Sequence, residues 1–202
     1  MSAPIPADGT WFDTLKRSFA DVPIDDNSIA TGEFLEAAES LTTLFDLLGS
    51  AAFSPVKGDL TGNIKKVRER QLAAPGESQT LQDLVLNELK TKKHTASEGL
   101  LWLVRGLDFT AQSLRHNIDN ASEELSDSFR HAYTRTLKKH HSFIIKPIFS
   151  AAMSATPYRK SFYEKLGSDT EKVNAALERE VSALEKRVAI LKEFQERKEA
   201  KW

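Results

Sequence analysis

The sequence predicts an all-α fold in a single domain that covers residues 1–202. Apolar residues recur at helical spacing along most of the chain, and no segment alternates apolar and polar residues as a half-buried strand does. Glycine, proline and other breakers fall mostly between the helical runs, and no repeat or low-complexity linker divides the chain. We therefore expect helices packed around one core.

The N-terminal segment is predicted to form a short helix, a loop and a second helix. The short helix carries apolar residues at helical spacing, namely Trp11, Phe12, Leu15 and Phe19. Pro23 and two aspartates indicate a loop over residues 22–28. The second helix is expected to begin near Thr31, and its apolar face consists of Phe34, Leu41, Leu44, Phe45 and Leu48.

A third helix is predicted to begin at Ser54 and Pro55. Serine is a favourable N-cap, and proline suits the first helical position because no N–H partner is needed there. This helix runs to about Leu72, where the sequence AAPGE at residues 73–77 breaks it. A fourth helix follows over residues 78–92.

Three capping boxes predict the starts of three later helices. The pairs that form them are Thr95 with Glu98, Asn120 with Glu123, and Ser168 with Glu171. The first box opens the most apolar helix, which we expect at the centre of the domain because apolar residues lie on nearly all its sides. The second opens a helix that carries Phe129, Tyr133 and Leu137.

Two prolines and an apolar seam shape the C-terminal part. Pro147 should start or kink a helix near residues 141–146, and Pro157 should open a short helix. The long final helix carries an apolar seam of Val173, Leu177, Val181, Leu184, Val188 and Leu191. We expect this seam to pack on the rest of the domain, and the protein to be a monomer.

Composition excludes several classes of function. The 28 basic and 29 acidic residues nearly cancel, so nothing electrostatic favours nucleic acid as a partner. The chain contains no cysteine, which excludes disulfides, thiolate catalysis and cysteine-based zinc sites.

Targeting signals are also missing from the sequence. The N-terminal segment MSAPIPADGTWF lacks the features of a secretion signal, the start MSAP lacks a myristoylation site, and the end EAKW is no prenylation box. No run of about 18 apolar residues exists. We therefore expect a cytoplasmic protein that meets membranes peripherally and reversibly.

Asp59, Asn63 and Lys66 form a polar row on the third helix. Their spacing of four and then three residues places them on one helical face, along about 10 Å. An acceptor, an amide and a cation suit a polyhydroxylated ligand, because sugar hydroxyls both donate and accept hydrogen bonds. Taken alone, the row is more typical of a solvated polar surface.

Trp102 lies within the most apolar helix and is flanked by Gly99 and Gly106. Glycine destabilises a helix interior by roughly 1 kcal/mol relative to alanine, so two glycines here indicate close approach of another backbone or a ligand. The indole could stack on a sugar or belong to the core, and Arg105 could share its surface.

The adjacent residues His140 and His141 do not indicate a metal site. Their side chains point about 100° apart on a helix, and neither belongs to an H-E-x-x-H pattern. One of them could donate a hydrogen bond to a buried carbonyl. Nucleophile elbows, phosphate-binding loops and dinucleotide fingerprints are absent from the sequence. We therefore expect no enzymatic activity, no metal and no cofactor.

Four segments together resemble the glycolipid transfer protein family. They match its D-x-x-x-N-x-x-K signature, its L-L-W-L-x-R-G-L helix, its L-K-K-x-H-x-W segment and its A-x-P-Y turn. In this chain they are DLTGNIKK at 59–66, LLWLVRGL at 100–107, LKKHHSF at 137–143 and ATPY at 155–158. Their order and separations agree with the family over nearly the whole chain, and the sequence resembles the fungal branch linked to heterokaryon incompatibility.

The resemblance implies a two-layer helical sandwich of about eight helices that binds one glycosphingolipid, such as galactosylceramide, glucosylceramide or lactosylceramide. It implies that Asp59 accepts from the ceramide amide and His141 donates to the ceramide carbonyl. Asn63 and Lys66 would bind the first sugar, with Trp102 stacked beneath it and Arg105 as a secondary contact.

The resemblance also implies where the lipid chains and the membrane make contact. The chains would enter a hydrophobic tunnel lined by Val56, Leu137, Ile145 and Phe149. A transient membrane contact would be made by Phe143, Ile144, Lys146 and Tyr158. Phe143 stands where many animal members have tryptophan, and His140 replaces a tyrosine.

Three alternatives to a glycolipid carrier remain open from the sequence. A lipid sensor would use the same pocket and act through a protein partner. A carrier of ceramide 1-phosphate would use Lys66 and Arg105 for the phosphate, although Trp102 argues for a sugar. A structural protein would dimerise through its last helix.

Overall fold

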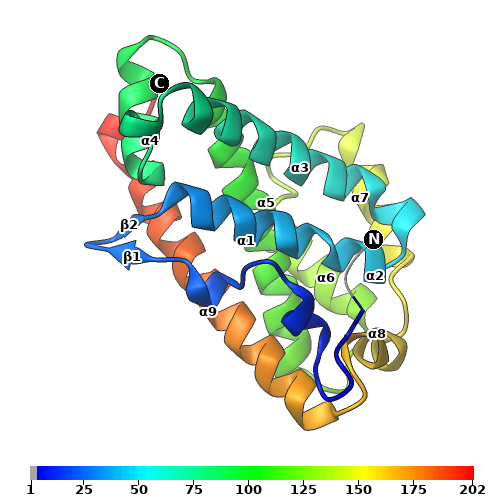
Figure 1. Ribbon diagram of the computed structural model, residues 1–202. Coiled ribbons are helices and arrows are strands. Elements are labelled where there is room, and N and C mark those ends of the chain that lie inside the picture. The colour runs from blue at the N-terminus through cyan, green and yellow to red at the C-terminus, as the bar shows by residue number, and fades with distance from the viewer. Residues whose placement is uncertain (1–3) are drawn as a thin grey trace.

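The computed structural model describes residues 4–202; the first three residues, where the sequence predicts no myristoylation site, lie outside the described part. Within the described residues the chain forms nine α-helical segments, one of them a single turn (Figure 1). They are α1 (Thr31–Thr42), α2 (Leu44–Leu47), α3 (Ser50–Ala73), α4 (Leu81–Lys90), α5 (Thr95–Asp119), α6 (Leu125–Arg135), α7 (Ile145–Ser154), α8 (Arg159–Leu166) and α9 (Thr170–Glu196). The predicted all-α class is confirmed.

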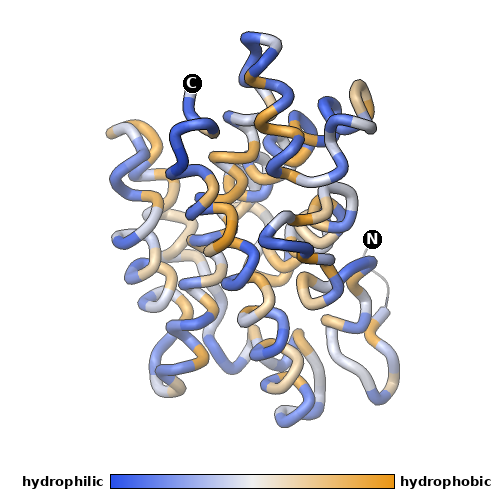
Figure 2. Tube along the Cα trace, turned by 90° about the vertical axis from the view of Figure 1, so that its left-hand side faces the viewer, coloured by the Kyte–Doolittle hydropathy of each residue, from blue (hydrophilic) through white to orange (hydrophobic). Residues whose placement is uncertain are grey.

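The central element is α5, as its apolar sequence predicts. It packs against α3, α6 and α9, while α1 packs on α3 in front of it (Figure 1). Hydrophobic and hydrophilic stretches alternate along the helices, as amphipathic helices around a shared core require (Figure 2). The α5 residues that are almost fully buried are Leu100, Leu103, Val104, Leu107, Phe109, Ala111 and Leu114.

The seam of the last helix packs inside the domain. All six of its apolar residues are buried, and α9 lies along α5. This confirms the expected packing and leaves no apolar seam on α9 for a second chain. None of the helices among residues 4–202 combines the length and apolarity needed to cross a bilayer.

The N-terminal segment differs from the prediction. Two 3-10 helices, η1 (Trp11–Thr14) and η2 (Phe19–Asp21), replace the short α-helix, and a hairpin of β1 (Ile24–Asp25) and β2 (Ser28–Ile29) replaces the loop. The hairpin turns at Asp26 and Asn27, whose φ angles of 43° and 58° suit a tight two-residue connection. Strands of two residues are too short to produce a visible alternation.

Buried polar groups of α9 hold this N-terminal segment in place. The Glu180 carboxylate accepts from the Phe19 N–H at 3.0 Å and from the Ser18 hydroxyl, and Arg187 donates to the Val22 carbonyl at 2.6 Å. Burial raises the pKa of Glu180, although the hydrogen bonds from Phe19 and Ser18 act in the opposite direction. Burial lowers the pKa of Arg187, although the charges of Glu180 and Asp21 act in the opposite direction.

The third helix starts earlier than predicted. Gly49, with a φ of +110°, precedes it, and α3 begins at Ser50, so Pro55 is its sixth residue rather than its first. Only the first four N–H groups of a helix lack internal partners, so at the sixth position the proline removes one hydrogen bond from the second turn. The predictions for the later prolines hold, since Pro147 lies in the first turn of α7 and Pro157 just precedes α8.

The three predicted capping boxes are wrong. In α5 the cap comes from α4, because the buried Glu88 carboxylate accepts from the N–H groups of Ala96 and Ser97 at 2.9 and 2.7 Å and from the Ser97 hydroxyl at 2.7 Å. In α9 the cap is Asp169, one residue after the predicted one. The carboxylates of Glu88 and Asp169 each form stronger hydrogen bonds with the first N–H groups of their helix than a hydroxyl would.

The second predicted box lies at the end of α5 instead of the start of a helix. The Asn120 side chain donates to the His116 carbonyl at 2.8 Å, and α6 begins only at Leu125. Asparagine suits a helix end as well as a start, so its identity alone did not decide between them.

Substitution of Glu88 tests this capping arrangement. We expect Glu88→Ala to lower the free energy of unfolding by about 2–3 kcal/mol, because three buried donors lose their acceptor. The matched control is Glu98→Ala, which removes the acid of the sequence-predicted box and should change the same quantity by less than about 0.5 kcal/mol. Chemical denaturation measures both, and a larger loss for Glu98→Ala would contradict the structure.

Candidate functional site

The polar row predicted on α3 exists as a connected chain of side chains. The Asn63 amide donates to the Asp59 carboxylate at 3.3 Å, and the Lys66 ammonium donates to the Asn63 carbonyl oxygen at 3.3 Å. Asn63 is buried, Lys66 is half-buried and Asp59 lies at the exposed end. The spacing therefore places the three residues on one face, as predicted.

Two glycines bring this face of α3 close to α5. A Cβ added to Gly99 would lie 3.0 Å from the Lys66 Cβ and 3.3 Å from the Asn63 carbonyl oxygen, and one added to Gly106 would lie 2.7 Å from a Leu60 methyl carbon. The close approach that the glycines predicted is therefore made by another helix.

Trp102, on the same side of α5, is half-buried among cationic and imidazole groups. The Arg105 guanidinium lies 4.7 Å from the centre of its ring, a cation–π contact. The His140 ring meets it edge-on at 6.2 Å, and the His141 ring lies nearly parallel to it at 6.4 Å. Because Arg105 covers one face of the indole, a sugar ring can stack only on the other face.

His141 is oriented by Tyr133, a residue that the sequence did not single out. The Tyr133 hydroxyl lies 3.1 Å from Nδ1 of His141, and the buried tyrosine ring stacks on Phe149 at 5.4 Å. Loss of hydration, then the nearby charges of His140 and Lys146, lower the pKa of His141. When the hydroxyl donates to Nδ1 of this neutral ring, Nε2 carries the proton and is the donor that remains.

These groups line one pocket of about 470 Å³, which we name the Trp102 pocket. Its lining residues are Pro55, Asp59, Asn63, Lys66, Glu98, Trp102, His140, His141, Ser142, Ile145, Ile148 and Phe149. All five predicted headgroup residues are among them, whereas Arg105 is not and touches the pocket only through Trp102.

The Asp59 carboxylate is the charged acceptor of the row and is partly desolvated. Loss of hydration raises its pKa, although the Lys66 charge and the hydrogen bond from Asn63 act in the opposite direction. An N–H donor from a ligand would favour the ionised form of this carboxylate. The pocket thus offers two carboxylate acceptors, Asp59 and Glu98, and several sugar-compatible groups.

Similarity to known proteins in sequence and in structure identifies the family of this chain. A profile of the glycolipid transfer protein family matches residues 29–168. The chain belongs to the glycolipid transfer protein family. A glycolipid transfer protein of Aureobasidium melanogenum is 68% identical over 200 residues, which cover 99% of this chain and 100% of that protein.

Solved members of the glycolipid transfer protein family share the fold. The crystal structure of HET-C2, a fungal glycolipid transfer protein, aligns with a TM-score of 0.94 and 65% identity over 96% of this chain and 100% of that one. The corresponding domain of FAPP2, solved in work on its selection of simple glycosphingolipids, aligns at 0.84 and 32% identity over 93% and 95% of the two chains. The two-layer sandwich is therefore the fold of this protein.

A mouse relative is much longer than this family domain. Pleckstrin homology domain-containing family A member 8 is 34% identical over 183 residues, which cover 86% of this chain and 35% of that protein. The chain thus spans about a third of that relative.

Most of the residues that are predicted to line the tunnel are buried by packing against their neighbours. Val56, Leu137 and Phe149 are buried, with 5%, 4% and 7% of their surface exposed. Ile145 and Phe149 form part of the pocket wall, and Phe149 packs on His141 at 4.5 Å. The sequence predicts apolar residues beside the polar site, but the packing of their side chains decides which of them are accessible from the pocket.

The predicted membrane residues are strongly exposed. Phe143, Tyr158 and Ile144 expose 83%, 76% and 62% of their surface, and Lys146 is exposed as well. Ile148, which the sequence did not single out, adds a 39% exposed apolar side chain one turn from Ile144. These residues form a partly apolar strip along and around α7.

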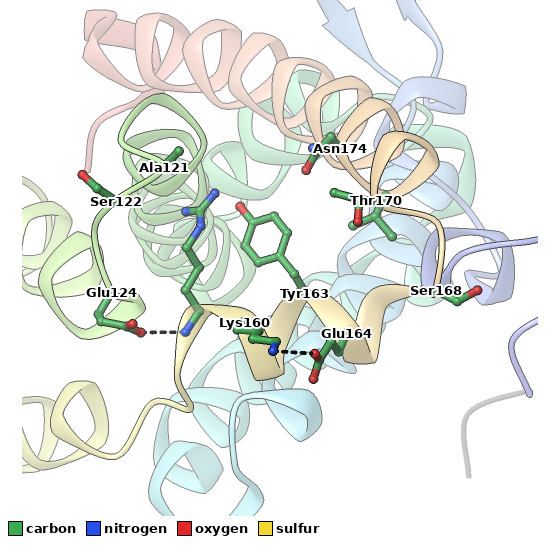
Figure 3. Close-up of a pocket in the computed structure, with 12 residues that line it drawn as sticks. Ala121, Ser122, Glu124, Lys160, Tyr163, Glu164, Ser168, Thr170 and Asn174 are labelled. Carbon is green, nitrogen blue, oxygen red and sulfur yellow. Dashed lines mark hydrogen bonds and ion pairs between the residues drawn. The ribbon is translucent and has the colours of Figure 1, made fainter.

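A larger hollow of about 750 Å³ lies between the α5–α6 connection, α8 and the start of α9 (Figure 3). It shares no lining residue with the Trp102 pocket. Its charged groups already have partners, since the Arg159 guanidinium bonds to Asn117, the Arg159 N–H donates to Glu124 at 2.6 Å, and Lys160 lies 3.9 Å from Glu164. Size alone therefore does not identify the functional site.

A substitution at the helix crossing tests the geometry of the Trp102 pocket. We expect Gly99→Ala to lower the free energy of unfolding by about 1–3 kcal/mol, because its Cβ would push against the Lys66 Cβ and the α3 backbone. Gly62→Ala is the matched control on α3, where an added Cβ meets no atom within 4 Å. It should raise the same quantity by about 0.5–1 kcal/mol. Equal effects in thermal or chemical denaturation would refute the crossing.

Proposed function

We propose that this protein binds one glycosphingolipid in the Trp102 pocket and carries it between membranes without covalent chemistry. The observation that carries the proposal is the pocket itself, where a carboxylate, an amide, an ammonium group and a neutral imidazole surround one open indole face. An apolar wall of Ile145, Ile148 and Phe149 adjoins these groups. That combination matches a ligand that is polar at one end and apolar at the other.

The ceramide amide fits between Asp59 and His141. Its N–H would donate to the partly desolvated carboxylate, and its carbonyl would accept from Nε2 of the imidazole. Unpartnered amide groups cost about 1–3 kcal/mol each once they leave water. The two side chains thus allow the linkage between sugar and chains to be buried.

The first sugar fits above the row of Asn63 and Lys66. Both side chains have hydrogen-bonding capacity beyond their mutual contact, and sugar hydroxyls can satisfy it as donors and acceptors. The uncovered face of Trp102 would lie against the C–H groups of the ring. Galactosylceramide, glucosylceramide and lactosylceramide all present such a first sugar.

The lipid chains must push apart side chains that pack against one another in the free protein. The wall that they meet belongs to α7, which packs on α3 and α6. Each methylene hidden from water contributes roughly 0.8 kcal/mol, so a long chain supplies enough free energy to open packed residues such as Leu137 and Phe149. We propose that the tunnel forms as the chains enter.

Docking on the cytoplasmic face of a membrane would be made by Phe143, Ile144, Lys146 and Tyr158, with Ile148. Exposed aromatic and aliphatic side chains partition into the interface between headgroups and chains, and a lysine favours anionic lipids. The strip is small, so contact would be transient and the protein could leave with its cargo.

Ceramide 1-phosphate fits the pocket less well than a glycolipid. Among the lining residues Lys66 is the one permanent cation, and Asp59 and Glu98 are both acidic. A phosphate with up to two negative charges favours a cluster of cations. A sensor that acts through a partner would use the same pocket and would bind lipid without transferring it.

The test is transfer of fluorescent galactosylceramide between vesicles, with fluorescent ceramide 1-phosphate measured in parallel. We expect rapid transfer of galactosylceramide, and at least a tenfold loss in Asp59→Val and Trp102→Ala, which corresponds to about 1.4 kcal/mol. The matched control is Glu69→Gln, which alters an exposed carboxylate elsewhere on α3. Circular dichroism should show that all variants remain helical.

Three results would count against this proposal. Transfer of only the phosphate lipid would reassign the ligand. Binding of galactosylceramide without transfer would favour the sensor. If folded Asp59→Val transferred galactosylceramide at the wild-type rate, the assignment of the headgroup site would be wrong.

The membrane contact has its own matched test. We expect Phe143→Ser to slow vesicle transfer about 5- to 20-fold, since one aromatic side chain loses its place in the interface, while affinity for glycolipid in micelles stays unchanged. Leu72→Ser is the control, because Leu72 is 73% exposed but lies at the far end of α3. An equal loss in both variants would show that the strip on α7 has no special role.

A further inference from the structure

One short pattern, a hydroxyl residue followed by proline, any residue and a basic residue, occurs at two places in the chain. The two segments are SPVK at residues 54–57 and TPYR at residues 156–159. Proline-directed protein kinases recognise this pattern, with the proline directly after the acceptor hydroxyl. Such kinases bind the acceptor segment in an extended conformation, so a copy inside a helix is not available to them. The structure therefore decides between the two copies.

The first copy lies inside a helix. Ser54 is exposed, but it belongs to the second turn of α3. Val56 is buried with 5% of its surface exposed, and the Lys57 ammonium lies 2.7 Å from the Asp46 carboxylate. An extended conformation at Ser54 would unwind the start of α3, expose Val56 and break this ion pair. The folded chain therefore withholds Ser54 from a kinase.

The second copy lies between α7 and α8, where residues 156–158 form neither helix nor strand. A residue before proline is restricted to extended conformations, and Tyr158 has a φ of −56° and a ψ of 144°, close to polyproline II. The half-buried Thr156 hydroxyl donates to the Met153 carbonyl at 3.0 Å, a local bond that rotation of the side chain releases. The segment thus already has the shape that a kinase binds.

The basic part of the second copy is doubled. Arg159 is half-buried and bonds to Asn117, whereas the next residue, Lys160, is exposed. Lys160 can therefore meet the acidic groups of a kinase while Arg159 keeps its place in the fold.

The space beside Thr156 can hold a phosphate. A hollow of about 430 Å³ lies between the start of α6 and the turn from α7 to α8, and Thr156 and Tyr158 form part of its wall. Glu124 is the one charged residue among those that line it. One cation lies at its edge, because Arg130 donates to Ser154 at 2.7 Å.

We propose that Thr156 is a phosphorylation site and that its phosphate switches off the membrane contact around α7. The inference rests on the proposed function, which supplies that contact. In the modification, Oγ1 of Thr156 attacks the γ-phosphorus of a nucleoside triphosphate held by a proline-directed kinase. A new P–O bond forms, the bond from this phosphorus to the oxygen that bridges it to the β-phosphate breaks, the hydroxyl proton passes to a carboxylate of the kinase, and a nucleoside diphosphate leaves.

The phosphate would change the charge of the membrane contact. Thr156 lies two residues before Tyr158, which is 76% exposed. A phosphothreonine carries a charge of about −1.5 to −2 at pH 7, which exceeds that of Lys146, the one cation of the proposed contact. Anionic lipids repel such a group, and it remains in water rather than entering the interface.

The headgroup site lies apart from this modification. The hollow beside Thr156 and the Trp102 pocket share no lining residue. We therefore expect phosphorylation to weaken docking on a membrane and to leave the affinity for glycolipid unchanged.

The first experiment treats the folded full chain with a cyclin-dependent kinase and ATP, and locates the phosphate by mass spectrometry. We expect one phosphate on the wild type and on Ser54→Ala, and none on Thr156→Ala. Ser54→Ala is the matched control because it removes the acceptor of the helical copy of the same pattern. A phosphate on Ser54, or none on the folded chain, overturns the site.

The second experiment measures binding to vesicles before and after phosphorylation. We expect the phosphorylated protein to bind vesicles that contain phosphatidylserine about 5- to 20-fold more weakly, with a smaller change on pure phosphatidylcholine. Added salt should narrow the difference, and affinity for galactosylceramide in micelles should stay within about twofold. A phosphate on Thr156 with unchanged vesicle binding overturns the switch.

Two substitutions separate the charge of the phosphate from the loss of the hydroxyl. Thr156→Glu adds about one negative charge and should weaken binding to the anionic vesicles about threefold. Thr156→Val removes the hydrogen bond to Met153 without adding charge and should bind as the wild type does. An equal loss in both variants would show that the hydrogen bond matters rather than the charge, and would overturn the switch.

The two assays also separate this inference from the function beneath it. An unmodified protein that binds galactosylceramide but no vesicle overturns the membrane contact of the proposed function, and the switch with it. The kinase assay needs no lipid, so it confirms or overturns the site at Thr156 in either case.

Discussion

The close crossing of α3 over α5 is the constraint on which the Trp102 pocket depends. Without side chains at Gly99 and Gly106, the α3 backbone approaches α5 near enough for Asn63 and Lys66 to share one cavity with Trp102. Larger residues would hold the two helices apart and open the row to water. The glycines weaken α5 as an isolated helix, and the packing of α5 at the centre of the domain compensates for that loss.

Much of this arrangement could be predicted because it follows from spacing along one helix. Asp59, Asn63 and Lys66 share a face for geometric reasons, and the burial of α5 and of the α9 seam follows from apolar periodicity. The resemblance to the family then connected helices that periodicity treats separately. It brought Trp102 and His141 to the polar row, and the structure places both in the same pocket.

The features that sequence could not predict depend on contacts between distant or irregular segments. Glu88 caps a helix other than its own, so no local pattern marks it. Tyr133 reaches His141 only because α6 ends at Arg135 and the chain turns back. The sequence misplaces the start of α3, because Pro55 suits a first helical position whereas Gly49 marks the actual break.

The hydrogen bonds between α9 and the N-terminal segment affect the order in which the chain folds during its synthesis. Phe19 bonds to Glu180, a residue 161 positions later. At a synthesis rate of roughly 5–20 residues per second, the first segment waits roughly 8–30 s before its partner exists. The core helices between them can pack during that interval, and the hairpin can pack on α4, but η2 meets its partner α9 only at the end. Folding is therefore complete only after the last helix has been synthesised, because that helix binds the segment that was synthesised first.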